Sequence, residues 1–109
     1  MSTFAKDPKL VLVTGGTGLV GDALNQKVKQ LLKARKIDYH DFLFVFAGLK
    51  NCDLRDEAKT MKYFHRLRPS VVIHLAADVG GMIKNMDSKI RVEMYQNNTK
   101  INTNVLNAV

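Results

Sequence analysis

The chain has 109 residues, 46% of them hydrophobic and 25% charged, a composition that is typical of one globular domain and excludes a disordered chain. A single cysteine excludes an internal disulfide framework, and because we find no leader peptide and no long apolar run, we expect a cytoplasmic protein without a membrane partner. The net charge of +7 would suit nucleic acid, but the basic residues are dispersed and no aromatic residues interleave with them. We therefore predict a solvated helix face and no nucleic-acid partner.

Apolar runs and helical periodicities alternate along the chain. They predict a strand over Lys9–Thr14, a helix from Gly18 to about Arg35, strands over Phe42–Phe46 and Asn51–Leu54, a helix from Asp56 that Pro69 ends, a strand over Val71–Leu75 and a helix from about Ser88 to the end. Strands that alternate with helices are joined by right-handed crossovers and form a parallel sheet. The expected fold class is therefore α/β, the N-terminal part of a Rossmann-type doubly wound parallel sheet with its strands, numbered along the chain, in the order 3-2-1-4.

Three glycines follow the first expected strand. Gly15, Gly18 and Gly21 form the pattern G-x-x-G-x-x-G between the apolar run Leu10–Val13 and the first helix. The pattern predicts a phosphate-binding turn, in which Gly15 permits the tight turn, Gly18 lets a diphosphate approach the backbone, and Gly21 lets the helix pack closely. A glycine-rich turn after a strand is also common as a simple tight connection. The other motifs therefore have to decide between a connection and a phosphate-binding turn.

Two further segments point to the same ligand, a dinucleotide. Asp53 is placed to accept a hydrogen bond from an adenine amino group, with Leu54 against the ring, although a position near the start of a helix would explain Asp53 equally well. Asp56 is predicted to cap that helix. The small residues of Leu75–Ala77 would let a ribose lie against the backbone where the strand order reverses, but they would also serve plain packing.

The end of the second expected strand indicates which dinucleotide is bound. An NAD site needs a carboxylate there to hold the ribose 2′-hydroxyl, but Phe46–Lys50 contains no acid, and Asp41 precedes the strand. Without an acid nothing repels a 2′-phosphate, and Lys50 could pair with it, although a surface role explains Lys50 as well. NADP is therefore the expected cofactor.

Together these motifs resemble the N-terminal part of an extended short-chain dehydrogenase/reductase. The resemblance is carried by Thr14–Gly21, Asp53 and Leu54, Val72–Ala77 and the asparagine-rich last helix, and it covers nearly the whole chain. Within this superfamily the segment Ala76–Met82 is similar to the NADP-dependent 3,5-epimerase/4-reductase branch that acts on GDP-4-keto-6-deoxy-mannose. The resemblance thus implies NADPH and a GDP-sugar as partners, and a homodimer for the complete enzyme.

The resemblance also implies a role for each matching residue. The diphosphate would be lined by Gly15, Thr17, Gly18, Leu19 and Val20, with Gly21 behind them, the adenosine by Asp53 and Leu54, the ribose by Leu75, Ala76 and Ala77, and the nicotinamide and substrate sugar would be approached by Val79, Gly80 and Gly81. Asn98 would brace the loops of the active site.

The acid–base residues of this superfamily have no counterpart in the chain. The resemblance places its serine, its Tyr-x-x-x-Lys pair and its Cys/His couple beyond Val109, and no tyrosine here is followed four residues later by lysine. We therefore expect no catalytic residue and no turnover from the 109-residue chain alone. His74 is expected to be a hydrogen-bonded core residue and Cys52 an inert small side chain, and no metal site is predicted.

The chain is expected to be a truncation. Its last helix would run to Val109 without a glycine or proline to end it, and the Val71–Leu75 strand would be an uncovered sheet edge. Residues 1–109 would then be the N-terminal portion of an NADP-binding Rossmann domain, without the rest of that domain and without a substrate domain.

Two other functions stay open. Another extended NAD(P)-dependent sugar-nucleotide epimerase or dehydratase would share the first motifs, but such enzymes keep NAD bound and need the missing acid after the second strand. A noncatalytic dinucleotide-binding or interaction protein is the alternative if Val109 is the natural end of the chain.

Overall fold

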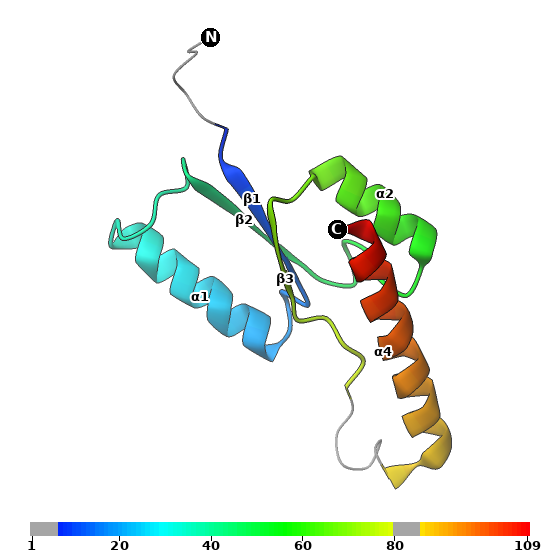
Figure 1. Ribbon diagram of the computed structural model, residues 1–109. Helices are drawn as coiled ribbons and strands as arrows, with labels where there is room; N and C mark the ends of the chain where they lie inside the picture. Colours follow the sequence, from blue (N-terminus) through cyan, green and yellow to red (C-terminus); the bar gives the residue numbers. More distant parts are fainter. Residues whose placement is uncertain (1–6, 80–85) are drawn as a thin grey trace.

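Strands and helices alternate in the computed structural model, which describes residues 7–79 and 86–109 (Figure 1). The elements are β1 (Lys9–Thr14), α1 (Leu19–Lys33), β2 (Phe42–Ala47), α2 (Glu57–Leu67), β3 (Val71–His74) and α4 (Ser88–Ala108). The predicted α/β class is confirmed, and these bounds lie close to the spans expected from the sequence.

The strand β1 is the centre of a parallel sheet of order β2-β1-β3. Its residue Lys9 pairs with Phe42 of β2, and Thr14 pairs with both Ala47 of β2 and His74 of β3. Parallel pairing brings the carboxyl ends of all three strands to one edge of the sheet. The residues of the segments that follow these strands therefore lie together at that edge.

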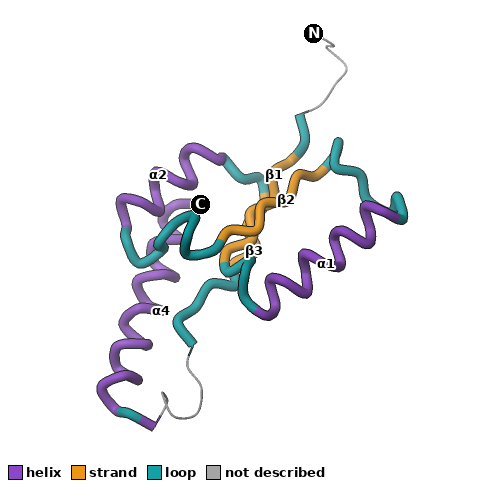
Figure 2. Tube along the Cα trace, turned by 180° about the vertical axis from the view of Figure 1, so that it is seen from behind, coloured by secondary structure: helices purple, strands orange, loops and turns teal. Residues whose placement is uncertain are grey.

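Helices cover both faces of the sheet: α1 lies on one face, and α2 and α4 lie together on the other (Figures 1 and 2). Leu12, which has no exposed surface, belongs to the core on the α2 and α4 side. Successive strand residues alternate between the faces, so Val11 and Val13, at 4% and 0% exposure, are buried on the α1 side. This explains the unbroken apolar run of β1, since a parallel strand covered on both faces needs apolar residues at every position.

The core beneath α2 and α4 joins residues that are far apart in sequence. Its buried members are Leu12, Ala47, Leu54, Tyr63, Phe64, Ile101 and Val105. The cluster therefore fixes the segment that carries Leu54 against the two helices.

The strand predicted over Asn51–Leu54 is absent, and this part of the prediction was wrong. The segment forms a turn instead: the N–H groups of Asn51 and Cys52 donate to the Gly48 carbonyl over 3.0 and 3.3 Å, and the Gly48 N–H donates to Asn51 Oδ1 over 2.8 Å. These local bonds use backbone groups that a strand would need for a ladder. The expected order 3-2-1-4 thus lacks its outer strand, while its three inner strands lie as predicted.

The ends of α2 follow the sequence signals. The Asp56 carboxylate accepts a hydrogen bond from the N–H of Lys59 over 3.0 Å, which confirms Asp56 as the N-cap. Arg68 ends the helix in the left-handed region, with φ of 48°, directly before Pro69. Within residues 7–79 and 86–109, no helix combines the length and the apolarity that crossing a membrane requires.

One buried polar side chain ties α4 to the segment between β2 and α2. Asn104 is 7% exposed, and its Nδ2 donates to the carbonyl oxygen of Leu54 over 2.9 Å. A buried carbonyl that loses its only side-chain donor loses a hydrogen bond without regaining water.

We expect Asn104→Ala to lower the free energy of unfolding by about 1–3 kcal/mol, because it leaves the buried Leu54 carbonyl without this donor. Chemical denaturation monitored by circular dichroism measures the effect. Asn107→Ala, at an exposed position of the same helix, is the matched control and should change the free energy by less than about 0.5 kcal/mol. Equal effects of the two substitutions would contradict the proposed tie.

Candidate functional site

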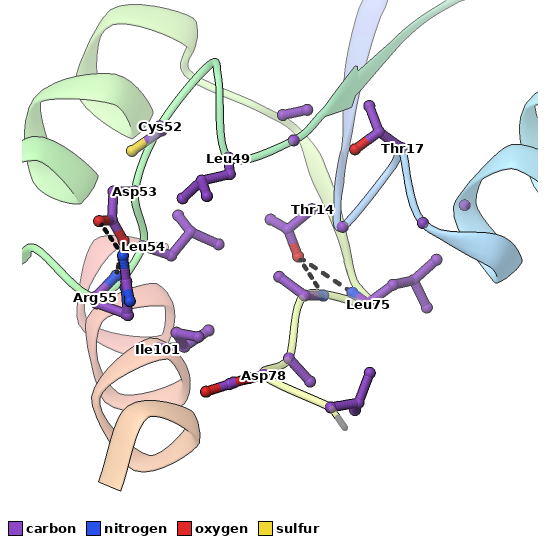
Figure 3. A pocket seen from close by; sticks show the side chains of 18 of the residues that line it. Thr14, Thr17, Leu49, Cys52, Asp53, Leu54, Arg55, Leu75, Asp78 and Ile101 are labelled. Atoms are coloured by element: carbon purple, nitrogen blue, oxygen red, sulfur yellow. Dashed lines mark hydrogen bonds and ion pairs between the residues drawn. The ribbon is translucent and has the colours of Figure 1, made fainter. Parts of the chain in front are cut away.

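A cleft of about 710 Å³ opens at the carboxyl ends of the three strands (Figure 3). Its lining residues come from the ends of β1 and β2, from the segments after the three strands, and from the helices. They are Thr14 at the end of β1 and Gly15, Thr17 and Gly18 after it, Leu19, Val20 and Gly21 in α1, Ala47 at the end of β2 and Gly48, Leu49, Cys52, Asp53, Leu54 and Arg55 after it, Tyr63 in α2, Leu75, Ala76, Ala77, Asp78 and Val79 after β3, and Glu93, Asn97 and Ile101 in α4. Open α/β sheets bind their ligands in this position, between loops that diverge from neighbouring strands.

The cleft collects nearly all of the predicted binding residues. Every one of them that the structure describes lines it, except Lys50, which is exposed in the turn after β2 and does not belong to the lining. Gly80 and Gly81 lie outside the described residues.

The glycine turn is held against the segment after β3. Gly15 has φ of 64°, and a Cβ on it would lie 2.7 Å from the backbone nitrogen of Ala76, so both conformation and space exclude a side chain. The Thr14 hydroxyl oxygen accepts hydrogen bonds from the N–H groups of Leu75 and Ala76 over 3.1 and 3.3 Å (Figure 3). These contacts fix one wall of the cleft relative to the other.

Gly18 and Gly21 differ in what surrounds them. A Cβ on Gly21 would collide with the Gly15 carbonyl oxygen and come within 2.6 Å of Gly16, so this glycine serves the packing of α1 on the turn. A Cβ on Gly18 would meet only the Gly15 carbonyl oxygen, at 3.3 Å, and its backbone has ordinary angles of φ −78° and ψ −175°. Gly18 also begins α1 without a side-chain cap, so the first N–H groups of the helix are available to an anion.

The end of β2 meets the glycine turn. A Cβ on Gly48 would collide with the side chain of Thr17, so the two segments touch at this point. The first acidic residue of the lining after β2 is Asp53, beyond the turn that follows this contact.

Asp53 faces the cleft as one half of an ion pair (Figure 3). Arg55 donates from Nε to Oδ1 over 2.9 Å and from Nη2 to Oδ2 over 2.8 Å, and its backbone N–H donates to Oδ1 over 3.1 Å. The guanidinium hydrogen bonds hold the pKa of the Asp53 carboxyl below its usual value. Arg55 was not among the residues predicted for the cleft, although an arginine two residues after an acid in a loop is a signal that could have found it.

The segment after β3 is held by two asparagines of α4. Asn98 makes two hydrogen bonds to the backbone of Asp78: its Oδ1 accepts from the N–H over 2.6 Å and its Nδ2 donates to the carbonyl over 3.0 Å. Asn97 donates from Nδ2 to Asp78 Oδ2 over 3.0 Å. Asn98 thus braces the segment that carries Val79, as the resemblance implied.

His74 is hydrogen-bonded, as expected, but it is half-buried and does not belong to the core. Its Nδ1 lies 2.5 Å from Thr14 Oγ1, and its Nε2 lies 2.9 Å from Asn102 Oδ1. Because Thr14 Oγ1 already accepts two backbone N–H groups, its own hydrogen is free to donate to Nδ1, which leaves the Nε2 hydrogen for Asn102. Both ring nitrogens are used in holding β1, β3 and α4 together.

Cys52 lines the cleft but lacks the surroundings of a nucleophile. Burial, the largest effect, raises the pKa of its thiol, and a hydrogen bond with Thr60 only partly opposes this. The thiolate is therefore disfavoured at neutral pH. Within the described parts of the chain, no three His, Cys, Asp or Glu side chains gather in a way that could hold a metal ion.

These features, a glycine turn at a helix start and a cleft at the ends of parallel strands, agree with the sequence comparison. The profile of the NAD dependent epimerase/dehydratase family matches residues 11–109, and the chain belongs to that family. Within it, the sequence is similar to GDP-L-fucose synthase of Dictyostelium discoideum (43% identical over 98 residues, 90% of this chain and 28% of that protein) and to a probable GDP-L-fucose synthase of Drosophila melanogaster (46% over 98 residues, with the same coverage).

Solved structures show the same likeness. A GDP-L-fucose synthetase from Naegleria fowleri, bound to NADP, matches with a TM-score of 0.70 and 40% identity over 99% of this chain and 29% of that one. UDP-glucose 4-epimerase of Thermus thermophilus, in complex with NAD, matches with a TM-score of 0.63 and 27% identity over 91% of this chain and 33% of that one. The present chain therefore spans less than a third of the length of the curated relatives.

The surroundings of Gly18 and Gly21 predict that an alanine substitution affects a different property at each position. Gly21→Ala should destabilise the fold by about 1–3 kcal/mol, because its methyl group must displace the backbone of the turn. Gly18→Ala should cost less than about 1 kcal/mol, yet weaken dinucleotide binding at least about tenfold, because its methyl group enters the space in which a diphosphate would approach.

Thermal unfolding and a binding titration on the same samples measure both effects. Wild-type affinity in a stably folded Gly18→Ala variant would show that no ligand approaches Gly18.

Proposed function

We propose that this chain forms the cofactor-binding part of an NADP-dependent epimerase/reductase that converts GDP-4-keto-6-deoxy-mannose to GDP-L-fucose. The observation that carries the proposal is the cleft at the strand ends, where a Cβ on Gly18 would meet a single neighbouring atom beside the uncapped start of α1. The names of the similar proteins from Dictyostelium and Drosophila support GDP-L-fucose as the product, and the NADP-bound Naegleria structure supports the cofactor.

The lining residues suggest how the dinucleotide would lie. Its diphosphate would accept hydrogen bonds from the first N–H groups of α1, at Leu19–Gly21, where the helix dipole favours negative charge. Its adenosine would lie towards Asp53 and Leu54, and its nicotinamide half towards Leu75–Ala77 and Val79, which line the cleft on the β3 side. This layout follows the division of the cleft between the loops after β2 and after β3.

The preference for NADP over NAD rests on charge after β2. Ala47, Gly48 and Leu49 line the cleft there, and none of them is an acid that would hold a 2′-hydroxyl and repel a 2′-phosphate. Lys50 follows them in an exposed turn, so its side chain would act from the rim of the cleft. The role we propose for Lys50 is therefore that of a peripheral charge.

The rest of the reaction would need residues that this chain does not supply. Bound NADPH provides the hydride for reduction of the C4 keto group. The acid–base groups for epimerisation at C3 and C5 would come from outside residues 1–109, so we propose that these residues alone bind cofactor weakly and do not turn over. A homodimer in the cytoplasm is the corresponding expectation for the complete enzyme.

Cofactor titration tests the proposed function. We expect NADPH to bind about tenfold more tightly than NADH, a difference of about 1.4 kcal/mol, and Lys50→Ala to reduce this preference because it removes a positive charge near the 2′-phosphate. Lys33→Ala, at the far end of α1, lowers the net charge equally and should leave the preference unchanged.

Fluorescence of the reduced nicotinamide reports both affinities. Equal affinities for the two cofactors would contradict the NADP assignment, and tighter binding of NADH would favour an NAD-dependent sugar-nucleotide epimerase or dehydratase.

A further inference from the structure

Arg55 holds the Asp53 carboxylate, which lines the side of the cleft where we propose that the adenosine lies. Its guanidinium engages both oxygens of Asp53, and its own backbone N–H gives Oδ1 a second donor. Two of the three hydrogen bonds are the guanidinium pair to both carboxylate oxygens and the third comes from the backbone, so rotation of the Asp53 side chain would break at least one of them (Figure 3). A planar guanidinium fork is the group best suited to hold a carboxylate in one orientation.

The three hydrogen bonds from Arg55 limit how many further hydrogen bonds Asp53 can accept. A carboxylate offers about four acceptor positions, two on each oxygen. Among the described residues, two donors meet Oδ1 and one meets Oδ2, so Oδ2 keeps one position with respect to them for a ligand. A single N–H group, such as one hydrogen of an adenine 6-amino group, fits that position.

Arg55 is also distinctive in its charge. Among the described residues that line the cleft it is the one Lys, Arg or His, whereas Asp53, Asp78 and Glu93 are acids. An aspartate carboxyl is ionised at neutral pH, and an ionised carboxylate can only accept hydrogen bonds. It would therefore meet an amino group favourably and a carbonyl group unfavourably.

From this geometry we propose that Arg55 is the positioning residue for base selectivity: its fork holds Asp53 as a fixed acceptor that admits the 6-amino group of adenine and rejects a 6-oxo purine. The proposal rests on the proposed function, since it needs a dinucleotide with its adenine beside Asp53.

The probe is a pair of ligands that differ at the purine 6-position and in the hydrogen that hypoxanthine carries on N1. NADPH carries the adenine amino group, and reduced nicotinamide hypoxanthine dinucleotide phosphate carries an oxygen instead. The ratio of their dissociation constants, measured on one protein sample, is insensitive to partial misfolding. We expect the intact wild-type protein to favour NADPH by about tenfold, the range of one hydrogen bond to a charged group.

Four single variants and one double variant separate the effect of the guanidinium pair from those of charge and of folding. Arg55→Ala and Arg55→Lys should both reduce the ratio to less than about threefold, because neither side chain can grip both oxygens. Asp53→Asn should remove the preference, and adding Arg55→Ala to it should cause no further loss of preference, as expected of residues that act as one unit. Lys59→Ala is the matched control, since Lys59 acts on Asp53 through charge without a hydrogen bond to it, and should leave the ratio unchanged.

The outcomes are distinct. A ratio that stays at the wild-type value in Arg55→Ala or in Arg55→Lys would overturn the role of the fork, even if both ligands bind more weakly. A ratio that falls as far in Lys59→Ala would assign the effect to charge and overturn it as well. If the wild-type protein bound neither ligand, the proposed function itself would fail, and this inference with it.

Discussion

The close approach of the Gly15 turn to the backbone of Ala76 is the constraint on which the cleft depends. A positive φ at Gly15 sends the chain from β1 across the end of β3, with no space for a side chain between the two backbones. The hydroxyl of Thr14 adds hydrogen bonds to the same segment. Because β1 is the central strand, fixing its end relative to β3 also fixes the start of α1, where an anion would bind.

The helix α4 holds both sides of this cleft through its polar side chains. Asn98 binds the backbone after β3, Asn102 lies against His74 at the end of β3, and the buried Asn104 binds the Leu54 carbonyl. Asn98 and Asn104, which are part of the family resemblance, thus make long-range hydrogen bonds to the backbone of loops. A helix that braces loops in this way lets a rigid scaffold position residues that sit outside regular structure.

Much of this architecture could be predicted from the sequence because it is encoded locally. The apolar run of β1, the glycine spacing and the Asp56 cap are short-range signals, and each was found where expected. The predicted strand at Asn51–Leu54 was wrong because the Asn51 side chain bonds back to Gly48 and forms a turn. The pairing of Arg55 with Asp53 is local but leaves no trace in the hydrophobic periodicity, and the contact of Asn104 could not be foreseen because it depends on where a loop and a distant helix meet.

A crystal structure of the protein with bound NADP tests the central claim most directly. The account predicts that diphosphate oxygens lie about 2.7–3.2 Å from backbone nitrogens at the start of α1, between Gly18 and Gly21, with the adenine beside Asp53. A dinucleotide bound outside the cleft, or a diphosphate placed away from this helix start, would contradict it.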